Sequence, residues 1–178
     1  MNLGEDYSIR LLFPSDAINQ FKTGDVAFQP LKAFFRNQAL DFQQAGVAKT
    51  YVAATHENPA KILGFITLTA SEVDIREGYE LEDCPYANRY DSLPAVKIAR
   101  LATDSRYRGQ GVGALLVSVA LALAKDEIAE RIGCRFLITD AKQEAIYFYQ
   151  SQGLTLLDTE ENRQSPTPIM FLDLLTVD

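Results

Sequence analysis

The stretch that decides the fold is Arg108-Gly109-Gln110-Gly111-Val112-Gly113. It lies between a predicted strand at 96–103 and a predicted helix at 111–132, whose apolar residues recur at helical spacing. The first N–H groups of a helix have no partners inside the helix, and glycines let an anion approach them closely. The stretch therefore predicts a loop that holds a phosphate group.

Two other kinds of phosphate-binding loop fit this spacing poorly. A Walker loop requires a Lys-Ser or Lys-Thr pair after its second glycine, and none follows Gly109. A dinucleotide fingerprint requires G-x-G-x-x-G in alternating βαβ units, whereas Leu116 stands in place of the third glycine. On the glycines alone, a simple tight turn remains an alternative.

Strands and helices are predicted on both sides of this loop. Before it we expect a strand at 7–12, a short helix ending near 21, a helix from Pro30 to Gly46, and a hairpin of strands at 49–54 and 62–69. After it we expect a strand at 136–139, a helix at 141–152, and strands at 154–157 and 169–174. The order predicts a single α/β domain over residues 1–178, with a mixed sheet covered by helices.

The bulk composition restricts the partners. Lys and Arg number 17 against 24 Asp and Glu, which gives a formal net charge of −7 and disfavours nucleic acid on charge alone. Neither the start of the chain nor any later apolar run resembles a signal or a membrane span, so a cytoplasmic location is expected. Cys84 and Cys134 are expected to be free thiols, and His56 lies in a predicted turn.

The segment 72–92 is acidic and rich in tyrosine, with few aliphatic residues. It is expected to be a long connection, and long loops are often functional. Glu80, Glu82 or Asp83 could accept a proton from a substrate ammonium group or attract a cationic amine. A solvated charged loop is the alternative.

Two motifs in sequence order resemble the GNAT acetyltransferase superfamily. Arg108, Gly111 and Gly113 match its Q/R-x-x-G-x-G/A pattern, and Ala145 to Leu154 is similar to its A-x-x-F-Y-x-x-x-G-F pattern, with Leu154 in place of Phe. The resemblance implies a mixed, mostly antiparallel sheet of six to seven strands that splays at the cofactor site, flanked by about four helices. It also implies an acyltransferase that uses acetyl-CoA as acetyl donor.

Further residues resemble the GNAT toxins of bacterial toxin–antitoxin pairs. These are Gly24-Asp25 ahead of the Pro30 helix, Thr50-Tyr51-Val52, and the run Ala99 to Asp104. The resemblance implies an aminoacyl-tRNA acceptor and an antitoxin partner, and a homodimer is left open. The acidic balance counts against the tRNA acceptor, although Arg36, Lys49, Arg100, Arg106 and Arg108 could cluster locally.

The resemblance also implies the site residues. Tyr149 is aligned with the tyrosine that gives a proton to the leaving thiolate, whereas adjacent Tyr147 faces elsewhere on the helix. Aromatic core packing is the alternative role for both. Cofactor contacts, including a backbone N–H directed at the thioester carbonyl oxygen, are implied for Leu101, Ala102, Thr103, Arg108, Gly109, Gln110, Gly111, Val112, Gly113 and Ala114.

The preferred function is transfer of an acetyl group from acetyl-CoA directly to a primary amine, without metal or covalent intermediate. The acceptor is expected to be an amine-bearing small molecule or peptide. The alternatives are a toxin-type acetyltransferase that acts on aminoacyl-tRNA and a non-catalytic acyl-CoA-binding module.

Overall fold

The computed structural model describes residues 7–177, and these residues form two compact units. Unit 1 holds the described residues of Met1–Thr69 and Ala99–Ala120, and unit 2 holds those of Ala70–Ile98 and Leu121–Asp178. Strand β3 (Ile62–Val73), strand β4 (Leu93–Thr103) and helix α3 (Val112–Ala122) each run from one unit into the other. That the whole chain is one domain remains a prediction.

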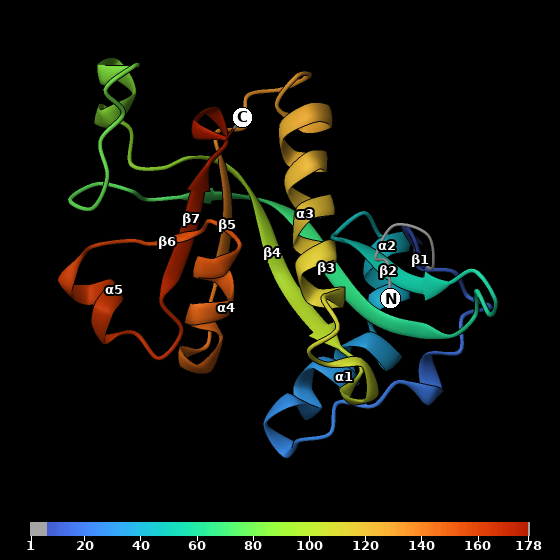
Figure 1. Cartoon of the computed structure of the whole chain (residues 1–178). Coiled ribbons are helices and arrows are strands. Elements are labelled where there is room, and N and C mark those ends of the chain that lie inside the picture. The colour runs from blue at the N-terminus through green and yellow to red at the C-terminus, as the bar shows by residue number, and fades with distance from the viewer. Residues whose placement is uncertain (1–6, 178) are drawn as a thin grey trace. The chain divides into compact units, whose positions relative to one another are not determined.

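The sheet of unit 1 begins with an antiparallel hairpin, as predicted (Figure 1). Strand β1 (Tyr7–Leu11) pairs antiparallel with β2 (Lys49–Thr55), and β2 pairs antiparallel with β3, with a register shift at Ala53/Ala54. The strand order in this unit is β1-β2-β3-β4. His56 lies in the exposed turn after β2, where the sequence places it.

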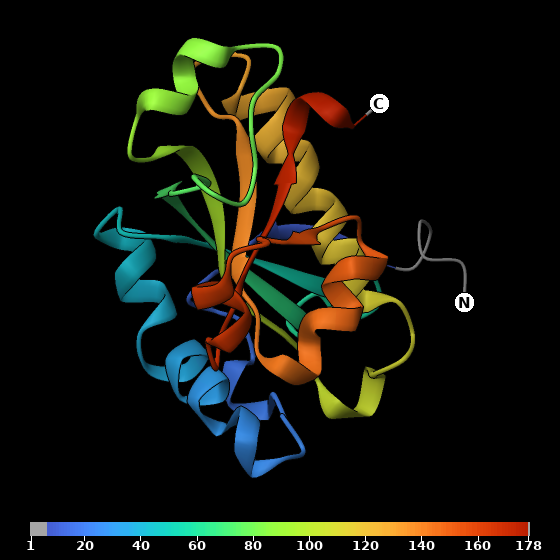
Figure 2. The same ribbon diagram turned by 90° about the vertical axis from the view of Figure 1, so that its left-hand side faces the viewer.

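The helices of unit 1 cover an aromatic core. The rings of Phe35 and Phe65 stack with centroids 4.1 Å apart, and Phe21 meets both edge-on. The predicted helix from Pro30 to Gly46 is two helices that change direction at Gln38, which has φ −133° (Figure 2). This break lets Phe35 before it and Ala39 after it both reach the core, where each is 1% exposed. The bounds are η1 Ile18–Gln20, η2 Val26–Phe28, α1 Gln29–Asn37 and α2 Ala39–Gln44.

In unit 2 the strand order is β3-β4-β5-β7-β6. Strand β5 pairs parallel with β4 and antiparallel with β7, and β6 pairs antiparallel with β7. A second aromatic core is built on Tyr79, Phe136 and Phe171, whose rings meet edge-on. The bounds are η3 Pro85–Arg89, β5 Phe136–Asp140, η6 Gln143–Ala145, α4 Ile146–Ser151, β6 Thr155–Leu156, α5 Glu160–Gln164, β7 Ile169–Asp173 and η7 Leu174–Thr176.

The sheet matches the predicted class. Within residues 7–177 its seven strands are mixed and mostly antiparallel, and five α-helices accompany them where about four were predicted. Helix α5, which begins after its N-cap Thr159, lies between the predicted strands at 154–157 and 169–174, where no helix was expected. The helix expected from Pro30 is divided into α1 and α2, whereas the short helix expected to end near residue 21 is the 3₁₀ turn η1. The ladder between β4 and β5 runs from Ala95↔Phe136 to Ile98↔Thr139, whereas β4 itself continues to Thr103. The parallel pairing therefore ends before the strand does, as the predicted splay requires.

The helix expected at 111–132 has a different geometry in its second half. Helix α3 ends at Ala122 and is followed by a π-helix over Leu123–Ile128, in which Ala129 N donates to Ala124 O at 2.9 Å. Its sequence contains neither Pro nor Gly, so no local breaker marks the change. Among residues 7–177, no helix has the length and apolarity that a membrane crossing requires.

Candidate functional site

The glycine loop of unit 1 lies between a short 3₁₀ turn, η4 (Ser105–Tyr107), and helix α3. The helix begins at Gly111, whose carbonyl oxygen accepts the first helical hydrogen bond from Leu115 N at 3.0 Å. Its first turn lies closely against β3, because a Cβ at Gly64 would be only 2.8 Å from Val112 Cγ1 and 3.1 Å from Ala102 O. Glycine at position 64 therefore permits this close approach of the helix to the strand.

The loop backbone fits an anion such as a pyrophosphate. Gly109 and Gly111 have φ values of 74° and 82°, in the region that favours glycine. The space where a Cβ of Gly109 would point has no atom within 4 Å. The N–H groups of Val112, Gly113 and Ala114 belong to the first helical turn, which cannot pair them internally. The strand, the glycine loop and the helix thus supply amides and open space together.

The two arginines of the loop have partners within unit 1. The Arg106 guanidinium is paired with the buried carboxylate of Asp104, with Nη2 2.7 Å from Oδ2. The Arg108 guanidinium donates to Thr23 O and lies over the Phe28 ring, with Cζ 4.7 Å from the centroid. Arg106 is thus neutralised by a carboxylate, and Arg108 keeps an exposed charge beside the start of α1.

The end of β4 carries the other residues implied as cofactor contacts. Leu101, Ala102 and Thr103 are half-buried, and Ala102 packs against the aromatic core of unit 1. Within the loop, Gly109 and Gln110 are exposed, Val112 is buried, and Gly113 and Ala114 are intermediate. Unit 1 therefore contains every predicted site residue except Tyr149.

Tyr149 lies in α4 of unit 2. Its side chain is 7% exposed, whereas that of Tyr147 is 82% exposed, so the two tyrosines have opposite environments. Burial raises the pKa of the Tyr149 phenol, and a hydrogen bond with the Thr139 hydroxyl acts in the opposite direction. The Thr139 hydroxyl in turn donates to Ile98 O at 3.1 Å. The phenol is thus neutral at physiological pH. Through the Thr139 hydroxyl it is linked by hydrogen bonds to Ile98, the last residue of β4 that pairs with β5.

The acidic segment of unit 2 is partly ordered by ion pairs. Asp83 pairs with Arg135, whose guanidinium also binds the buried Asp173, and Tyr79 donates to Asp173 Oδ2 at 3.0 Å. The hydrogen bond from Arg135 holds the pKa of Asp83 below its usual value, although desolvation acts in the opposite direction. Of the three carboxylates proposed from the sequence, Asp83 is therefore engaged in an ion pair.

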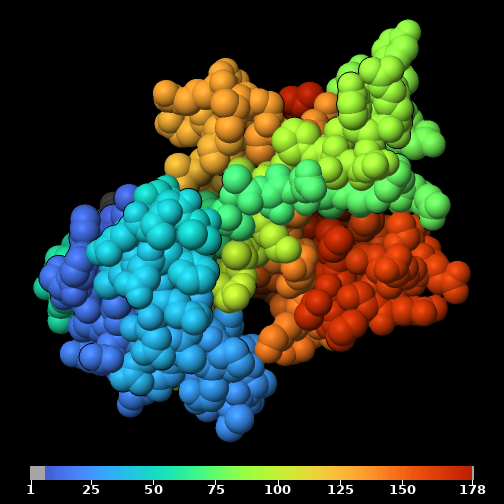
Figure 3. All heavy atoms as spheres, turned by 180° about the vertical axis from the view of Figure 1, so that it is seen from behind, coloured from blue at the N-terminus to red at the C-terminus, as the bar shows by residue number. Residues whose placement is uncertain are grey.

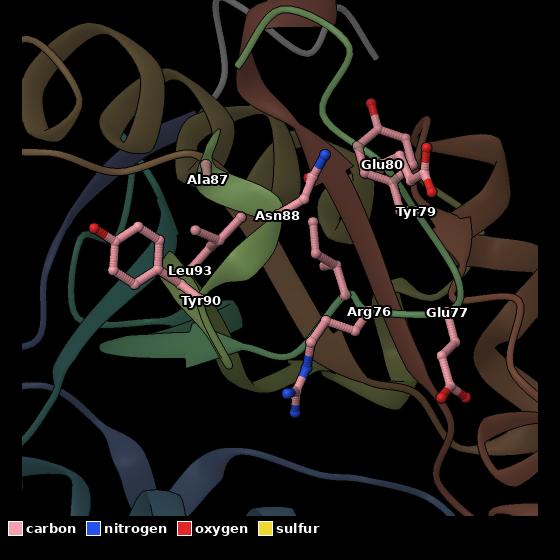
Figure 4. A pocket seen from close by; sticks show the side chains of 9 residues that line it. Arg76, Glu77, Tyr79, Glu80, Ala87, Asn88, Tyr90 and Leu93 are labelled. Carbon is pink, nitrogen blue, oxygen red and sulfur yellow. The ribbon is translucent and has the colours of Figure 1, made fainter. Parts of the chain in front are cut away.

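A hollow in the same segment has a volume of about 130 Å³ (Figure 4). Its wall includes Glu80, Tyr79 and Tyr90, together with the apolar Leu93. Ligand pockets usually measure about 300–1,000 Å³, so this hollow is too small for a nucleotide cofactor. Figure 4 shows the Arg76 guanidinium pointing out of it, toward the side where Arg76 binds Asp74 and Asp91.

A wider groove lies along α1 in unit 1, with a volume of about 440 Å³. It is lined by Asn19, Gln29, Lys32, Ala33, Arg36 and Asn37, and this set contains two cations and no carboxylate. The Arg36 guanidinium is oriented by a neutral amide, since Nε and Nη2 donate to Asn19 Oδ1 at 3.1 and 3.0 Å. The light-blue residues of this region lie at the surface in the space-filling view (Figure 3).

Two more cations lie on the aromatic side chains of this helical region. Arg100 lies over Phe34, with Cζ 5.1 Å from the ring centroid, and Arg108 lies over Phe28. In the described part of the chain, Lys32, Arg36, Arg100 and Arg108 are in no ion pair with a carboxylate. We call these four residues the α1 cations.

The charge of the chain is divided unequally between the units. Unit 1 has nine Lys and Arg against seven Asp and Glu, and unit 2 has eight against seventeen. The whole negative excess therefore belongs to unit 2. The argument from net charge against a nucleic-acid partner does not apply to unit 1.

The strand, glycine loop and helix of unit 1 have the arrangement expected of an α/β protein that binds a phosphate-containing ligand through backbone amides. Residues 47–154, more than half of the chain, match the sequence model of the acetyltransferase (GNAT) domain. The protein belongs to this family, and it is an acyltransferase that uses acetyl-CoA. The family predicted from two short motifs is thereby confirmed.

Solved structures of bacterial toxins have the same fold. AtaT in complex with acetyl-methionyl-tRNAfMet is 22% identical, with 96% of each chain covered and a TM-score of 0.81. A tyrosine-to-phenylalanine mutant of KacT is 20% identical, with 96% of each chain covered and a TM-score of 0.82. A mutant of the toxin AtaT bound to the C-terminus of the antitoxin AtaR is 24% identical over 96% of this chain and 94% of that one, with a TM-score of 0.73. At these identities the likeness shows a shared fold.

Three features of the candidate site were not predicted from the sequence: Asp104, Thr139 and the groove along α1. Asp104 ends β4 and caps η4, a role that its position before Ser105 and Arg106 could have signalled. No pattern in the sequence marks Thr139 or the groove along α1. A threonine inside a strand is commonplace, and the groove joins Asn19 to a helix that begins ten residues later.

Proposed function

We propose that this protein transfers the acetyl group of acetyl-CoA to the amino group of an aminoacyl-tRNA. The observation that carries the proposal is the set of α1 cations in unit 1, the unit that also contains the glycine loop. Phosphodiester backbones are bound chiefly by such Lys and Arg side chains. The AtaT complex with acetyl-methionyl-tRNAfMet supports the same acceptor.

In this proposal the donor is held by backbone groups of unit 1. Acetyl-CoA supplies the acetyl group as a thioester. The amides of Gly109 to Ala114 bind its pyrophosphate, aided by the dipole of α3. A backbone N–H within Leu101 to Thr103 donates to the carbonyl oxygen as negative charge develops there, and one such donor is worth about 3 kcal/mol in other enzymes.

Tyr149 is the proposed proton donor to the departing thiolate. A buried phenol whose pKa is raised keeps its proton at neutral pH, so it remains a hydrogen-bond donor throughout the physiological range. Thr139 orients the phenol and thereby fixes its direction. The structurally similar proteins include AtaT and KacT mutants in which a tyrosine is replaced by phenylalanine.

A protein partner belongs to the same proposal. The similar structures include the toxin AtaT bound to the C-terminus of the antitoxin AtaR. An antitoxin of this kind would restrain an enzyme that otherwise consumes aminoacyl-tRNA in the cytoplasm. Growth arrest when the chain is expressed alone, and its relief by a neighbouring small gene product, would support this part.

The acceptor can be tested with purified protein, acetyl-CoA and a panel of aminoacyl-tRNAs, uncharged tRNA, polyamines and free amino acids. We expect thiol release with one or more aminoacyl-tRNAs, and mass spectrometry should find the N-acetylated aminoacyl group. Uncharged tRNA serves as the matched control because it binds the same cations but offers no α-amino group. Faster thiol release with a small amine than with every aminoacyl-tRNA would contradict the proposal.

A further inference from the structure

Asp104 is a buried carboxylate that has no part in the proposed reaction. Its side chain is fully inaccessible, and it accepts four hydrogen bonds. Lys22 N and Arg106 Nη2 donate to Oδ2 at 2.9 and 2.7 Å, and Arg106 N and Nε donate to Oδ1 at 3.0 and 2.8 Å. Although burial opposes ionisation, these donors hold the pKa of Asp104 below its usual value.

The carboxylate joins two segments of unit 1 that are far apart in the chain. The segment 20–24 lies against residues 104–108, and its carbonyl groups accept further bonds from them. Gln20 O accepts from Arg106 Nη2 at 3.1 Å, Lys22 O accepts from Ser105 N at 2.8 Å, and Thr23 O accepts from Arg108. The two segments are therefore joined at four successive points, with Asp104 at the centre.

The contact is close enough to require a glycine. Gly24 has φ 79°, and a Cβ at this position would be 2.9 Å from Ser105 Cβ. No larger residue fits without moving the backbone of one segment or the other. The junction is thus a tightly packed unit in which Asp104 supplies the only negative charge among the bonded groups.

The junction ends where the phosphate loop begins. Arg108 is the last tied residue, and the next residues include Gly109 and Gly111, whose backbones are intrinsically mobile in the absence of restraints. Amides bind an anion best when they are already oriented, because no ordering cost then remains. Because Arg108 is already held in place, fewer loop residues must become ordered when an anion binds.

We infer that Asp104 is a positioning residue for the donor, holding residues 104–108 on the segment 20–24 so that the following amides are oriented toward pyrophosphate. This inference rests on the proposed placement of the pyrophosphate at the glycine loop. It assigns a donor-binding role to the N-terminal segment, which contributes no atom to the loop itself. The acetyl-CoA affinity should therefore depend on a carboxylate that does not contact acetyl-CoA.

Asp104→Asn tests the inference because it preserves size but removes the charge and one of the two acceptor oxygens. Calorimetric titration with acetyl-CoA should show a Kd raised about tenfold, the scale of losing one or two charge-assisted hydrogen bonds. At saturating acetyl-CoA, kcat with the acceptor should change less than about twofold, because no group at the reacting atoms is altered. Arg106→Gln, at a partly exposed side chain, should give a smaller change in the same direction.

Asp16→Asn is the matched control. Asp16 is in the same unit, its side chain is 2% exposed, and it accepts from Arg10 Nη1 and Nη2 at 2.9 and 2.7 Å. It also accepts from Phe13 N at 2.8 Å, so its surroundings match those of Asp104 in kind but hold a different turn. We expect both Asn variants to lower the thermal midpoint by similar amounts and only Asp104→Asn to raise the Kd.

The outcomes test two claims separately, namely the positioning role of Asp104 and the placement of pyrophosphate at the glycine loop. If Asp16→Asn raises the Kd as much as Asp104→Asn, or if neither raises it, the positioning role is overturned. If Gly111→Glu also leaves the Kd unchanged, then the placement of pyrophosphate at this loop is wrong as well. The binding measurement uses acetyl-CoA alone, so its result holds whichever amine is the acceptor.

Discussion

Units 1 and 2 each contain a buried aspartate held by an arginine, but the two pairs organise surfaces of opposite character. In unit 1, Asp104 and Arg106 hold the turn that precedes the glycine loop, in a unit with a small excess of basic residues. In unit 2, Asp173 and Arg135 tie Asp83 of the acidic segment to the sheet, in a unit with more than twice as many acidic as basic residues. The comparison shows that a whole-chain net charge describes neither surface.

The largest effect on this difference between the units is expected from a carboxylate placed in the glycine loop of unit 1. Gly111→Glu adds bulk at a residue with φ 82° and a negative charge where the pyrophosphate is proposed to bind. We expect the Kd for acetyl-CoA to rise about 100-fold or more, the equivalent of about 3 kcal/mol. Calorimetry measures it directly.

The matched control for that variant is Gly133→Glu in unit 2. Gly133 is exposed, and a Cβ there would have nothing within 4 Å. This variant should bind acetyl-CoA as the unaltered protein does. Equal loss of affinity in both variants would mean that added negative charge, rather than its position, is responsible.

Unit 2 is tested at Tyr149. Removing the phenolic hydroxyl in Tyr149→Phe should lower kcat about 100-fold, within the range for loss of a general acid, and should leave the Kd for acetyl-CoA within about twofold. Steady-state kinetics and calorimetry give the two numbers. Tyr147→Phe, at a side chain that is 82% exposed, should change neither. Full activity in the Tyr149 variant would remove the proton-donor role.

A moderate effect is expected from the α1 cations. Lys32→Ala and Arg36→Ala should each weaken tRNA binding about tenfold at low salt and lower the slope of log K against log salt by about one. Filter binding over a series of salt concentrations measures both. The control is Arg131→Ala in unit 2, where the side chain is 76% exposed and paired with Glu127. If that control lowers the slope equally, unit 1 is not the favoured surface.

The smallest effect concerns pH. Burial raises the pKa of Tyr149, so its proton-donating form is complete at neutral pH and is lost only as pH rises through the folded pKa. The basic limb of the kcat profile assigned to this group should therefore lie above pH about 10, the ordinary value for a phenol. A limb near pH 8 that persists in Tyr149→Phe would belong to another group.

The sequence predicts the loop and the order of elements well because both depend on local patterns. The glycines at 109 and 111 occupy conformations that few other residues adopt, and the hairpin strands at 49–54 and 62–69 are strand-like runs separated by turn residues. The break at Gln38 is different, since no Pro or Gly marks it and only the burial of Phe35 and Ala39 accounts for it. Tertiary packing overrides local helical preference there.

The site is predicted less completely for a similar reason. The motif around Tyr149 singles out that residue as a candidate, but its partner Thr139 belongs to a different element and leaves no pattern in the sequence. The opposite charge of the two units is also hidden, because each unit is assembled from two separate stretches of chain. A running average along the sequence mixes residues that the fold separates.

The π-helix at Leu123–Ile128 affects how this chain can be compared with its relatives. A π turn accommodates one residue more than the α-helix it interrupts, so it rotates the side chains that follow it by about one helical position. A relative with a straight helix in this place would need an alignment gap of one residue inside Leu123–Ile128. If the gap were placed elsewhere before β5, residues between the π-helix and that gap would be assigned to the wrong counterparts.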